Sequence, residues 1–127
     1  MKPLIYAIDD CSATLGMYVA ALRDLYEVKT FRGCSEKVIE QFVKDQPVLV
    51  ICDLLIPPQS GWDIADKLLE QIPYTPILIA TGVKGDEQQA LAEIYRFGYW
   101  QKSSNIKELR EIICQMIATS NPSLSKA

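Results

Sequence analysis

Apolar and polar positions along the chain follow two alternating patterns. Short runs of apolar, β-prone residues alternate with stretches in which apolar residues recur every three or four positions, as Leu15, Val19 and Leu22 do. Such runs are typical of strands, and such spacing is typical of amphipathic helices. The expected strands are residues 4–8, 26–31, 48–52, 77–80 and 98–102. The expected helices are residues 12–25, 35–45, 60–72, 86–94 and 105–117.

The order of these elements is strand then helix, repeated five times with short connections. This order predicts an α/β domain in which a five-stranded parallel sheet carries helices on both faces. The strand at 26–31 alternates apolar and polar residues, as an edge strand does, whereas 48–52 is apolar throughout and suits the sheet centre. A flavodoxin-like, doubly wound (βα)5 fold with strand order 2-1-3-4-5 satisfies both patterns. In that order strands one and three are neighbours at the switch point, where open sheets place their ligand sites.

Acidic residues follow the two strands that this order places side by side. Asp9 and Asp10 follow the first strand and Asp53 follows the third, so the fold brings three carboxylates together at the carboxyl-terminal edge of the sheet. Carboxylates that close together stay ionised only around a hard cation, and Mg²⁺ is the natural candidate. The fourth strand ends at a hydroxyl, Thr81, and the fifth ends at a cation, Lys102. These are the parts of an aspartyl-phosphate site, in which one carboxylate attacks phosphorus and cations hold the phosphoryl oxygens.

Taken in order, these strand-end residues resemble the receiver domain of two-component response regulators, of the single-domain type. The resemblance covers about residues 3–118. It rests on Asp9-Asp10, on D-x-x-x-P with a later glycine (Asp53, Pro57 and Gly61), on Thr81, and on Tyr99-x-x-Lys102. The resemblance implies a cytoplasmic phosphoprotein of a two-component or phosphorelay pathway.

The resemblance also implies a role for each site residue. Asp53 would be the phospho-acceptor, and Thr81 and Lys102 would hold the phosphoryl oxygens. Tyr99 would turn inward as Thr81 is drawn toward the phosphate, although core packing is an equally common role for such an aromatic. The groups implied to hold Mg²⁺, or Mn²⁺ in its place, are Asp9, Asp10, Asp53 and the backbone carbonyl of Leu55.

The implied partners are proteins. The phosphoryl donor would be a phosphohistidine on a sensor histidine kinase or a histidine phosphotransfer protein. A downstream target would bind the surface formed by the fourth helix, the fifth strand and the fifth helix.

The chain would not be an enzyme beyond Mg²⁺-dependent self-phosphorylation and self-dephosphorylation. Because the apolar Leu55 and Val83 cannot orient an attacking water, we expect phosphate loss to be slow.

The sequence departs from the family pattern in three places. Ser103 stands where the family usually has proline. Tyr95 and Arg96 stand where Gly-Ala usually ends the fourth helix, so that this end must be built differently, with Gly98 as one option. Gly82 fits the small residue expected after the fourth strand but loosens the loop. All three places lie on or near the expected signalling surface.

Composition bounds the class of protein. We expect one domain, with the receiver at 1–118 and a flexible polar tail at 119–127. A net charge of −3 argues against direct nucleic-acid binding, and no apolar span reaches the roughly 18 residues of a membrane helix. The chain has no histidine and no C-x-x-C pair, so free and mostly buried thiols are expected rather than zinc ligands.

Two other functions compete with the phospho-switch. A receiver-like scaffold would bind proteins without phosphate; the family departures favour it slightly, and the intact strand-end residues disfavour it. An enzyme on another substrate fits poorly. A phosphohydrolase of the haloacid-dehalogenase type would need D-x-D after the first strand, and a flavin site would need a richer Ser/Thr loop than residues 11–14.

Overall fold

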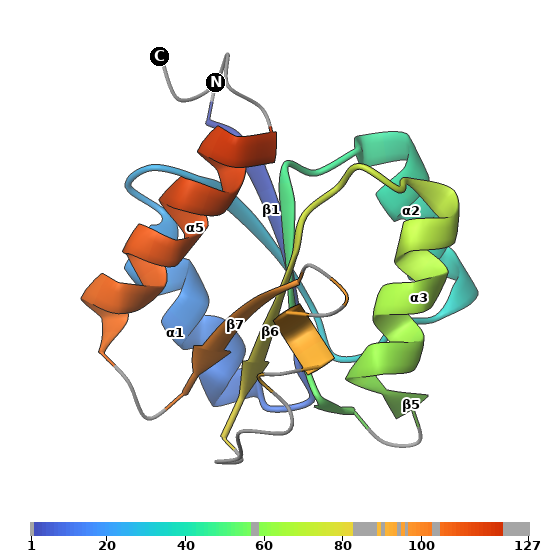
Figure 1. Cartoon of the computed structure of the whole chain (residues 1–127), viewed down its shortest axis with the longest axis horizontal. Coiled ribbons are helices and arrows are strands. Elements are labelled where there is room, and N and C mark those ends of the chain that lie inside the picture. The colour runs from blue at the N-terminus through green and yellow to red at the C-terminus, as the bar shows by residue number, and fades with distance from the viewer. Residues whose placement is uncertain are drawn as a thin grey trace.

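A five-stranded parallel sheet forms the centre of the molecule (Figure 1). The computed structural model describes residues 2–56, 59–82, 89, 91–93, 95, 97–102 and 105–120. The strand order is β2-β1-β3-β6-β7, which confirms the predicted order 2-1-3-4-5 and the flavodoxin-like fold. The strands are β1 (Leu4–Ile8), β2 (Glu27–Phe31), β3 (Leu49–Asp53), β6 (Ile77–Thr81) and β7 (Gly98–Gln101).

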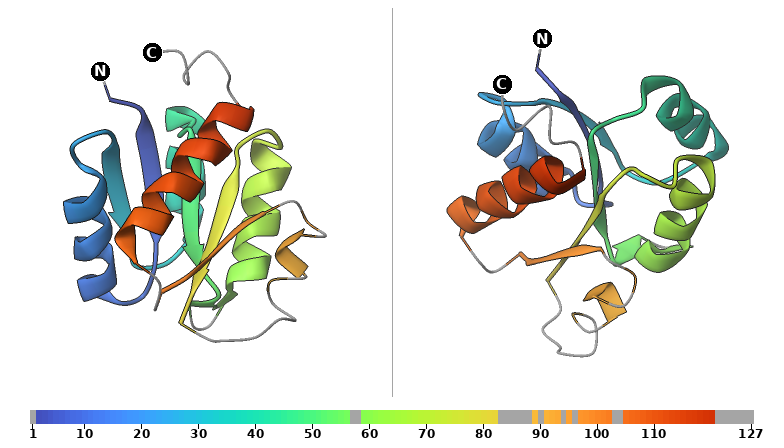
Figure 2. Two further views of the ribbon diagram at one scale, coloured as in Figure 1. Left: turned by 60° about the vertical axis from the view of Figure 1, so that its left-hand side comes forward. Right: turned by 45° about the horizontal axis from the view of Figure 1, so that its top comes forward.

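Helices cover both faces of this sheet (Figure 2). One face packs against α1 and α5, and the other against α2 and α3. The bounds are α1 (Ser12–Leu22), α2 (Glu36–Asp45), α3 (Gly61–Gln71) and α5 (Ile106–Ser120). None of the helices within the described residues is both long and apolar enough to cross a membrane.

Two helix ends differ from the prediction by three residues each, and the other described helix boundaries differ by one at most. Helix α1 ends at Leu22 rather than at Leu25, because the Leu22 carbonyl accepts hydrogen bonds from the backbone N–H groups of both Leu25 and Tyr26 and the chain turns there. Helix α5 continues to Ser120, so the first two residues of the expected 119–127 tail are helical. Most of the helix expected at 86–94 lies outside the described residues, as do Val83 and Ser103.

The helix starts agree with the sequence signals. The side chain of Ser35 accepts a hydrogen bond from the Val38 N–H at 3.4 Å, and Ser60 accepts one from Asp63 at 3.2 Å. Asn105 accepts one from the Glu108 N–H at 2.8 Å. Each contact satisfies a backbone donor that the first helical turn leaves unpaired.

The core has two layers, one on each face of the sheet. Every residue of β3 and β6 is buried, including the polar ends Asp53 and Thr81. This is the pattern of central strands in a parallel sheet. Of the four free cysteines, Cys34 and Cys52 are buried but Cys11 and Cys114 are exposed, so the expectation of mostly buried thiols is only half right.

Gly98 does not end a helix in the described part of the chain. It is the first residue of β7, and its φ is not positive. A Cβ atom at this position would collide with the side chain of Met116 on α5 and would lie 3.0 Å from that of Leu78. Glycine at 98 therefore lets α5 pack closely on the edge of the sheet, which corrects the suggested capping role.

Candidate functional site

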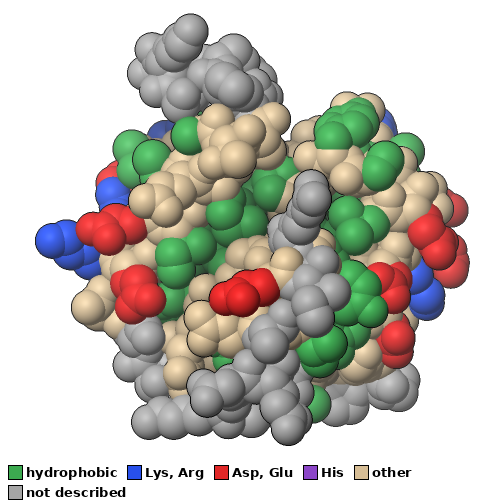
Figure 3. Space-filling view, in the orientation of Figure 1, with side chains coloured by type: hydrophobic (Ala, Val, Ile, Leu, Met, Phe, Trp, Pro, Cys, Tyr) green, Lys and Arg blue, Asp and Glu red, His purple; other side chains and the backbone are tan. Residues whose placement is uncertain are grey.

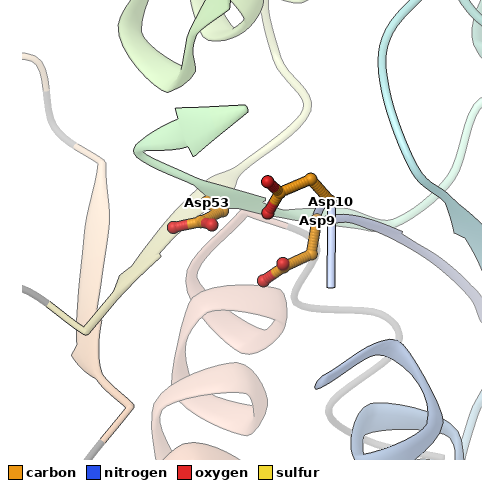
Figure 4. A group of neighbouring side chains, drawn as sticks. All are labelled: Asp9, Asp10 and Asp53. Atoms are coloured by element: carbon orange, nitrogen blue, oxygen red, sulfur yellow. The ribbon is translucent and has the colours of Figure 1, made fainter. Parts of the chain in front are cut away.

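Three carboxylates meet at the carboxyl ends of β1 and β3 (Figure 4). Asp9 and Asp10 follow β1, and Asp53 is the last residue of β3; the strands pair directly, with Ile8 opposite Cys52. One oxygen from each carboxylate lies within 4.8 Å of the others. Asp9 is 1% exposed and Asp53 7% exposed, whereas Asp10 is exposed. The predicted convergence of these acids is confirmed.

Lys102 brings a positive charge to this group. The residue follows β7, and its backbone N–H donates to the Thr81 carbonyl at 2.8 Å. Its Nζ donates to Asp9 Oδ2 at 2.6 Å and lies 3.3 Å from Asp53 Oδ2. The ends of four neighbouring strands are thereby joined at one edge of the sheet.

The shared burial of these groups shifts their ionisation. Burial, followed by the charge of Asp9, raises the pKa of the Asp53 carboxyl, and Lys102 only partly opposes this. Burial tends to lower the pKa of Lys102, but the hydrogen bond to Asp9 and the charges of both acids outweigh it and raise that pKa. A raised pKa makes the Asp53 oxygens more basic and the Lys102 ammonium more firmly charged.

The loop between β1 and α1 is held from two sides. The Cys11 N–H donates to Asp9 Oδ1 at 2.9 Å, which fixes the buried carboxylate against the start of α1. Arg32, just after β2, donates from Nη2 and Nε to the Asp10 carbonyl at 3.1 and 3.3 Å. The sequence analysis did not identify Arg32. Its position after the strand that neighbours β1 is the signal that could have indicated it.

The loop after Asp53 has a fixed path. Residues Leu55–Ile56 (β4) pair antiparallel with Gln59–Ser60 (β5), which the sequence did not predict. The Gly61 N–H donates to the Leu54 carbonyl at 2.8 Å, and a Cβ at Gly61 would overlap the Asp53 carbonyl. Glycine is therefore required for the chain to return this close to Asp53. Leu55, which we expect to flank the path of a water attacking a phosphoryl group on Asp53, is 61% exposed.

The two residues assigned to the switch lie on β6 and β7. Thr81 is 1% exposed at the end of β6, with its Cα opposite that of Gln101. Tyr99 is half-buried and packs against the core layer beneath α2 and α3. Both positions suit the roles that the resemblance implies, and those roles stay predictions.

The donor set fits a hard divalent cation. Three carboxylates and one ammonium leave an excess of negative charge in a largely buried site. The available ligand atoms are oxygens, which Mg²⁺ and Mn²⁺ prefer, and the chain contains no histidine. Asp10, exposed beside its two buried neighbours, is the group by which a hydrated ion could enter.

Comparisons with known proteins agree with this geometry. No family model matches the chain. The autoinducer 1 sensor kinase/phosphatase LuxN of Vibrio harveyi is 22% identical over 112 residues, which are 88% of this chain. The chain spans only 13% of the length of LuxN.

Solved receiver domains match nearly the whole chain. A signal receiver domain from Vibrio parahaemolyticus superposes with a TM-score of 0.85 and 18% identity, covering 97% of this chain and 95% of that one. A response regulator receiver domain protein from Clostridium thermocellum gives a TM-score of 0.78 and 26% identity, covering 92% and 95%. The chain therefore has the fold of CheY-like, response-regulator receiver domains.

Proposed function

We propose that this chain is a phospho-accepting receiver and that Asp53 takes the phosphoryl group from a phosphohistidine. The donor is a sensor histidine kinase or a histidine phosphotransfer protein, and the role implies a cytoplasmic location. The observation that carries the proposal is the contact of one lysine, Lys102, with two buried carboxylates, Asp9 and Asp53, at the end of the sheet.

Asp53 is the best placed of the three acids to act as nucleophile. Asp9 already accepts hydrogen bonds from Lys102 and from the Cys11 N–H, one on each oxygen. Asp53 makes the longer contact with Lys102 and has a raised pKa, so its oxygens are less tied and more basic. In the transfer, an Asp53 oxygen bonds to phosphorus while the phosphorus–nitrogen bond to the imidazole breaks and the imidazole leaves with the electron pair.

The remaining residues hold and neutralise the phosphoryl group. Lys102 reaches the acceptor with its ammonium, and Thr81 offers a hydroxyl from the neighbouring strand. Asp9, Asp10, Asp53 and the Leu55 carbonyl would hold Mg²⁺, with Mn²⁺ as a substitute. When bound, the ion supplies positive charge that offsets the repulsion between the carboxylates and the phosphoryl oxygens.

Signalling would pass through the surface around β7 and α5 to a downstream protein. Hydrophobic side chains gather between α5 and α3 (Figure 3). They line a groove of about 750 Å³ that includes Leu69, Tyr74, Tyr95, Ile112 and Met116, and none of the described residues in its lining is charged. Such a surface suits a protein partner better than a nucleic acid. The fourth helix of the expected surface lies mostly outside the described residues.

Phosphorylation tests the proposal directly. The protein is incubated with Mg²⁺ and a small acyl phosphate, and its intact mass is measured beside an Asp53→Ala control. We expect a gain of one phosphoryl group in the wild type only. A gain of equal size in Asp53→Ala would move the acceptor elsewhere. No gain, together with no saturable response to beryllofluoride in Mg²⁺, would favour the scaffold that works without phosphate.

A further inference from the structure

A buried tyrosine on α1 has a hydroxyl without a partner. Tyr18 is 1% exposed, and its Oη makes no hydrogen bond to any described residue. Leaving a hydroxyl unpaired in a protein interior is destabilising, and such groups are uncommon in native structures. The ring centroid of the neighbouring buried Trp100 lies 6.3 Å from that of Tyr18, and its Nε1 likewise has no hydrogen-bond partner among the described residues. This polar pair within an apolar layer needs an explanation.

This pair lies in the core layer on the face of the sheet to which Asp53 points. Asp53 lies two residues after Ile51 on β3 and therefore on the same face of the sheet, and Asp9 and Lys102 come just past the ends of β1 and β7, two residues after Ala7 and Trp100. Ala7, Ile51 and Trp100 belong to the core layer that contains Tyr18. The small residues Ala7 and Ala80 in this layer leave room for two large rings.

The tyrosine hydroxyl also lies within electrostatic reach of the site. Burial is the largest cause that raises the pKa of Tyr18, and the charges of Asp9 and then Asp53 raise it further. A phenol near two carboxylates is held in its protonated form and is therefore a hydrogen-bond donor.

We propose that Tyr18 is a positioning residue for phosphoryl binding at Asp53: its hydroxyl donates to Asp9 when Lys102 leaves Asp9 for the phosphoryl oxygens. This inference rests on the proposed phospho-acceptor function. In the structure, Lys102 makes its shorter contact with Asp9, at 2.6 Å, and its longer one with Asp53, at 3.3 Å. A lysine that holds a phosphoryl group on Asp53 must give up at least part of the shorter contact.

Asp9 would then be left short of donors. It is almost fully buried, and among the described residues its remaining hydrogen bond comes from the Cys11 N–H at 2.9 Å. A buried carboxylate oxygen that loses its hydrogen-bond donor is disfavoured even where a neighbouring cation balances its charge. The Tyr18 hydroxyl would replace Lys102 as the hydrogen-bond donor to Asp9, and no proton would be transferred. The Tyr18 hydroxyl is therefore unpaired in this structure, in which Lys102 contacts Asp9, and would be paired when Lys102 contacts the phosphoryl group.

Substitution of Tyr18 by phenylalanine separates this role from simple packing. The ring stays and only the hydroxyl is lost, so Tyr18→Phe should unfold at the same or a higher temperature, because a buried unpaired polar group has been removed. Its affinity for beryllofluoride in saturating Mg²⁺ should nevertheless fall about tenfold, the usual scale for a hydrogen bond to a charged group. Fluorine NMR measures the bound fraction, and thermal unfolding measures stability.

The matched control is Tyr26→Phe. Tyr26 belongs to the same core layer, but its charged neighbours are Arg110 and Asp24 rather than the acidic site. We expect wild-type affinity for this variant. Equal affinity in Tyr18→Phe and wild type would overturn the inference, and so would a clear loss of stability in Tyr18→Phe. If the wild type itself does not bind beryllofluoride, the proposed function fails, whatever the variants do.

Discussion

The acidic site should destabilise the metal-free protein, so that Asp53→Asn raises its stability. Asp53 shares the site with two other carboxylates within 4.8 Å and with one ammonium at 3.3 Å. At an effective dielectric constant of about 20, the repulsion from the buried Asp9 is about 3.5 kcal/mol and the attraction to Lys102 is about 5 kcal/mol, whereas solvent screens the repulsion from the exposed Asp10 to about 1 kcal/mol. These charge interactions nearly cancel, so the desolvation of the buried Asp53 carboxylate, which is the largest cause of its raised pKa and costs about 2 kcal/mol or more, leaves a net destabilisation of about 2 kcal/mol.

Replacing the Asp53 carboxylate with an amide of the same shape removes both its charge interactions and the desolvation of its charge. We expect the unfolding temperature of Asp53→Asn in a chelator to rise by about 5 to 8 °C, since about 1 kcal/mol shifts a domain of this size by roughly 4 °C. Differential scanning calorimetry in the chelator measures the shift. Saturating Mg²⁺ should reduce the difference, because an ion held by the three carboxylates would stabilise the native wild type.

The same chemical change at Asp45 provides the control, and it should change the unfolding temperature in the opposite direction. Asp45 accepts hydrogen bonds from the Tyr6 hydroxyl at 2.6 Å and from Lys29 at 3.0 Å, and these contacts lower the pKa of its carboxyl. Asp45→Asn should therefore lower the unfolding temperature. If Asp53→Asn also lowers it, the electrostatic account of the site is refuted.

The stability gain of Asp53→Asn should depend on pH in a stated direction. The pKa of the Asp53 carboxyl is raised above its ordinary 3.8, so the native state binds more protons than the unfolded state between 3.8 and the raised value. The wild type therefore loses stability as the pH rises through this window. The advantage of Asp53→Asn should be full above the raised pKa and absent below 3.8; a constant advantage across the window would contradict this assignment.

Three further substitutions test the surroundings of the acceptor. Lys102→Met should lower stability by about 3 kcal/mol in urea unfolding, because it leaves the buried Asp9 carboxylate without its cation, and an unchanged midpoint would contradict this. Gly61→Ala should lower stability by at least 1 kcal/mol through overlap with the Asp53 backbone, whereas Gly16→Ala in open space on α1 should not. Leu55→Asn should speed phosphate loss from the phosphorylated protein. An equal or slower rate would contradict the idea that phosphate loss is slow because the apolar Leu55 cannot orient the attacking water.

The strand ends show how much of this site the sequence could predict. An unbroken apolar run that stops at an acid, as 48–53 does, fixes both the strand and the edge at which the acid emerges. All parallel strands in such a sheet end at one edge, so placing Asp9, Asp53 and Lys102 together required only the strand order. That order followed from the contrast between the alternating edge strand and the apolar central ones.

The missed features depend on contacts that no local pattern specifies. The β4–β5 pair has two residues in each strand, too few for any periodicity, and Gly61 allows the close return on which it depends. Arg32 donates to a backbone carbonyl 22 residues away. Because every residue has a backbone carbonyl, the sequence does not indicate which one is contacted. On α1 the apolar spacing indicated Leu15, Val19 and Leu22; Leu15 and Leu22 are buried, but the third buried residue is Tyr18 rather than Val19. A tyrosine in such a stripe is indistinguishable from core until its hydroxyl is located.

The contact between Asp9 and Lys102 links the proposed metal site to the proposed phosphoryl site, because a phosphoryl group on Asp53 would compete with Asp9 for Lys102. A cation bound by the carboxylates would weaken the hold of Asp9 on that lysine and release it toward Asp53. Binding of the cation and of the phosphoryl group should therefore strengthen each other, and thermodynamic linkage requires the two factors to be equal. The factor by which Mg²⁺ raises beryllofluoride affinity should match the factor by which beryllofluoride raises Mg²⁺ affinity. In Lys102→Met the shared factor should shrink, because the lysine that couples the two ligands is gone.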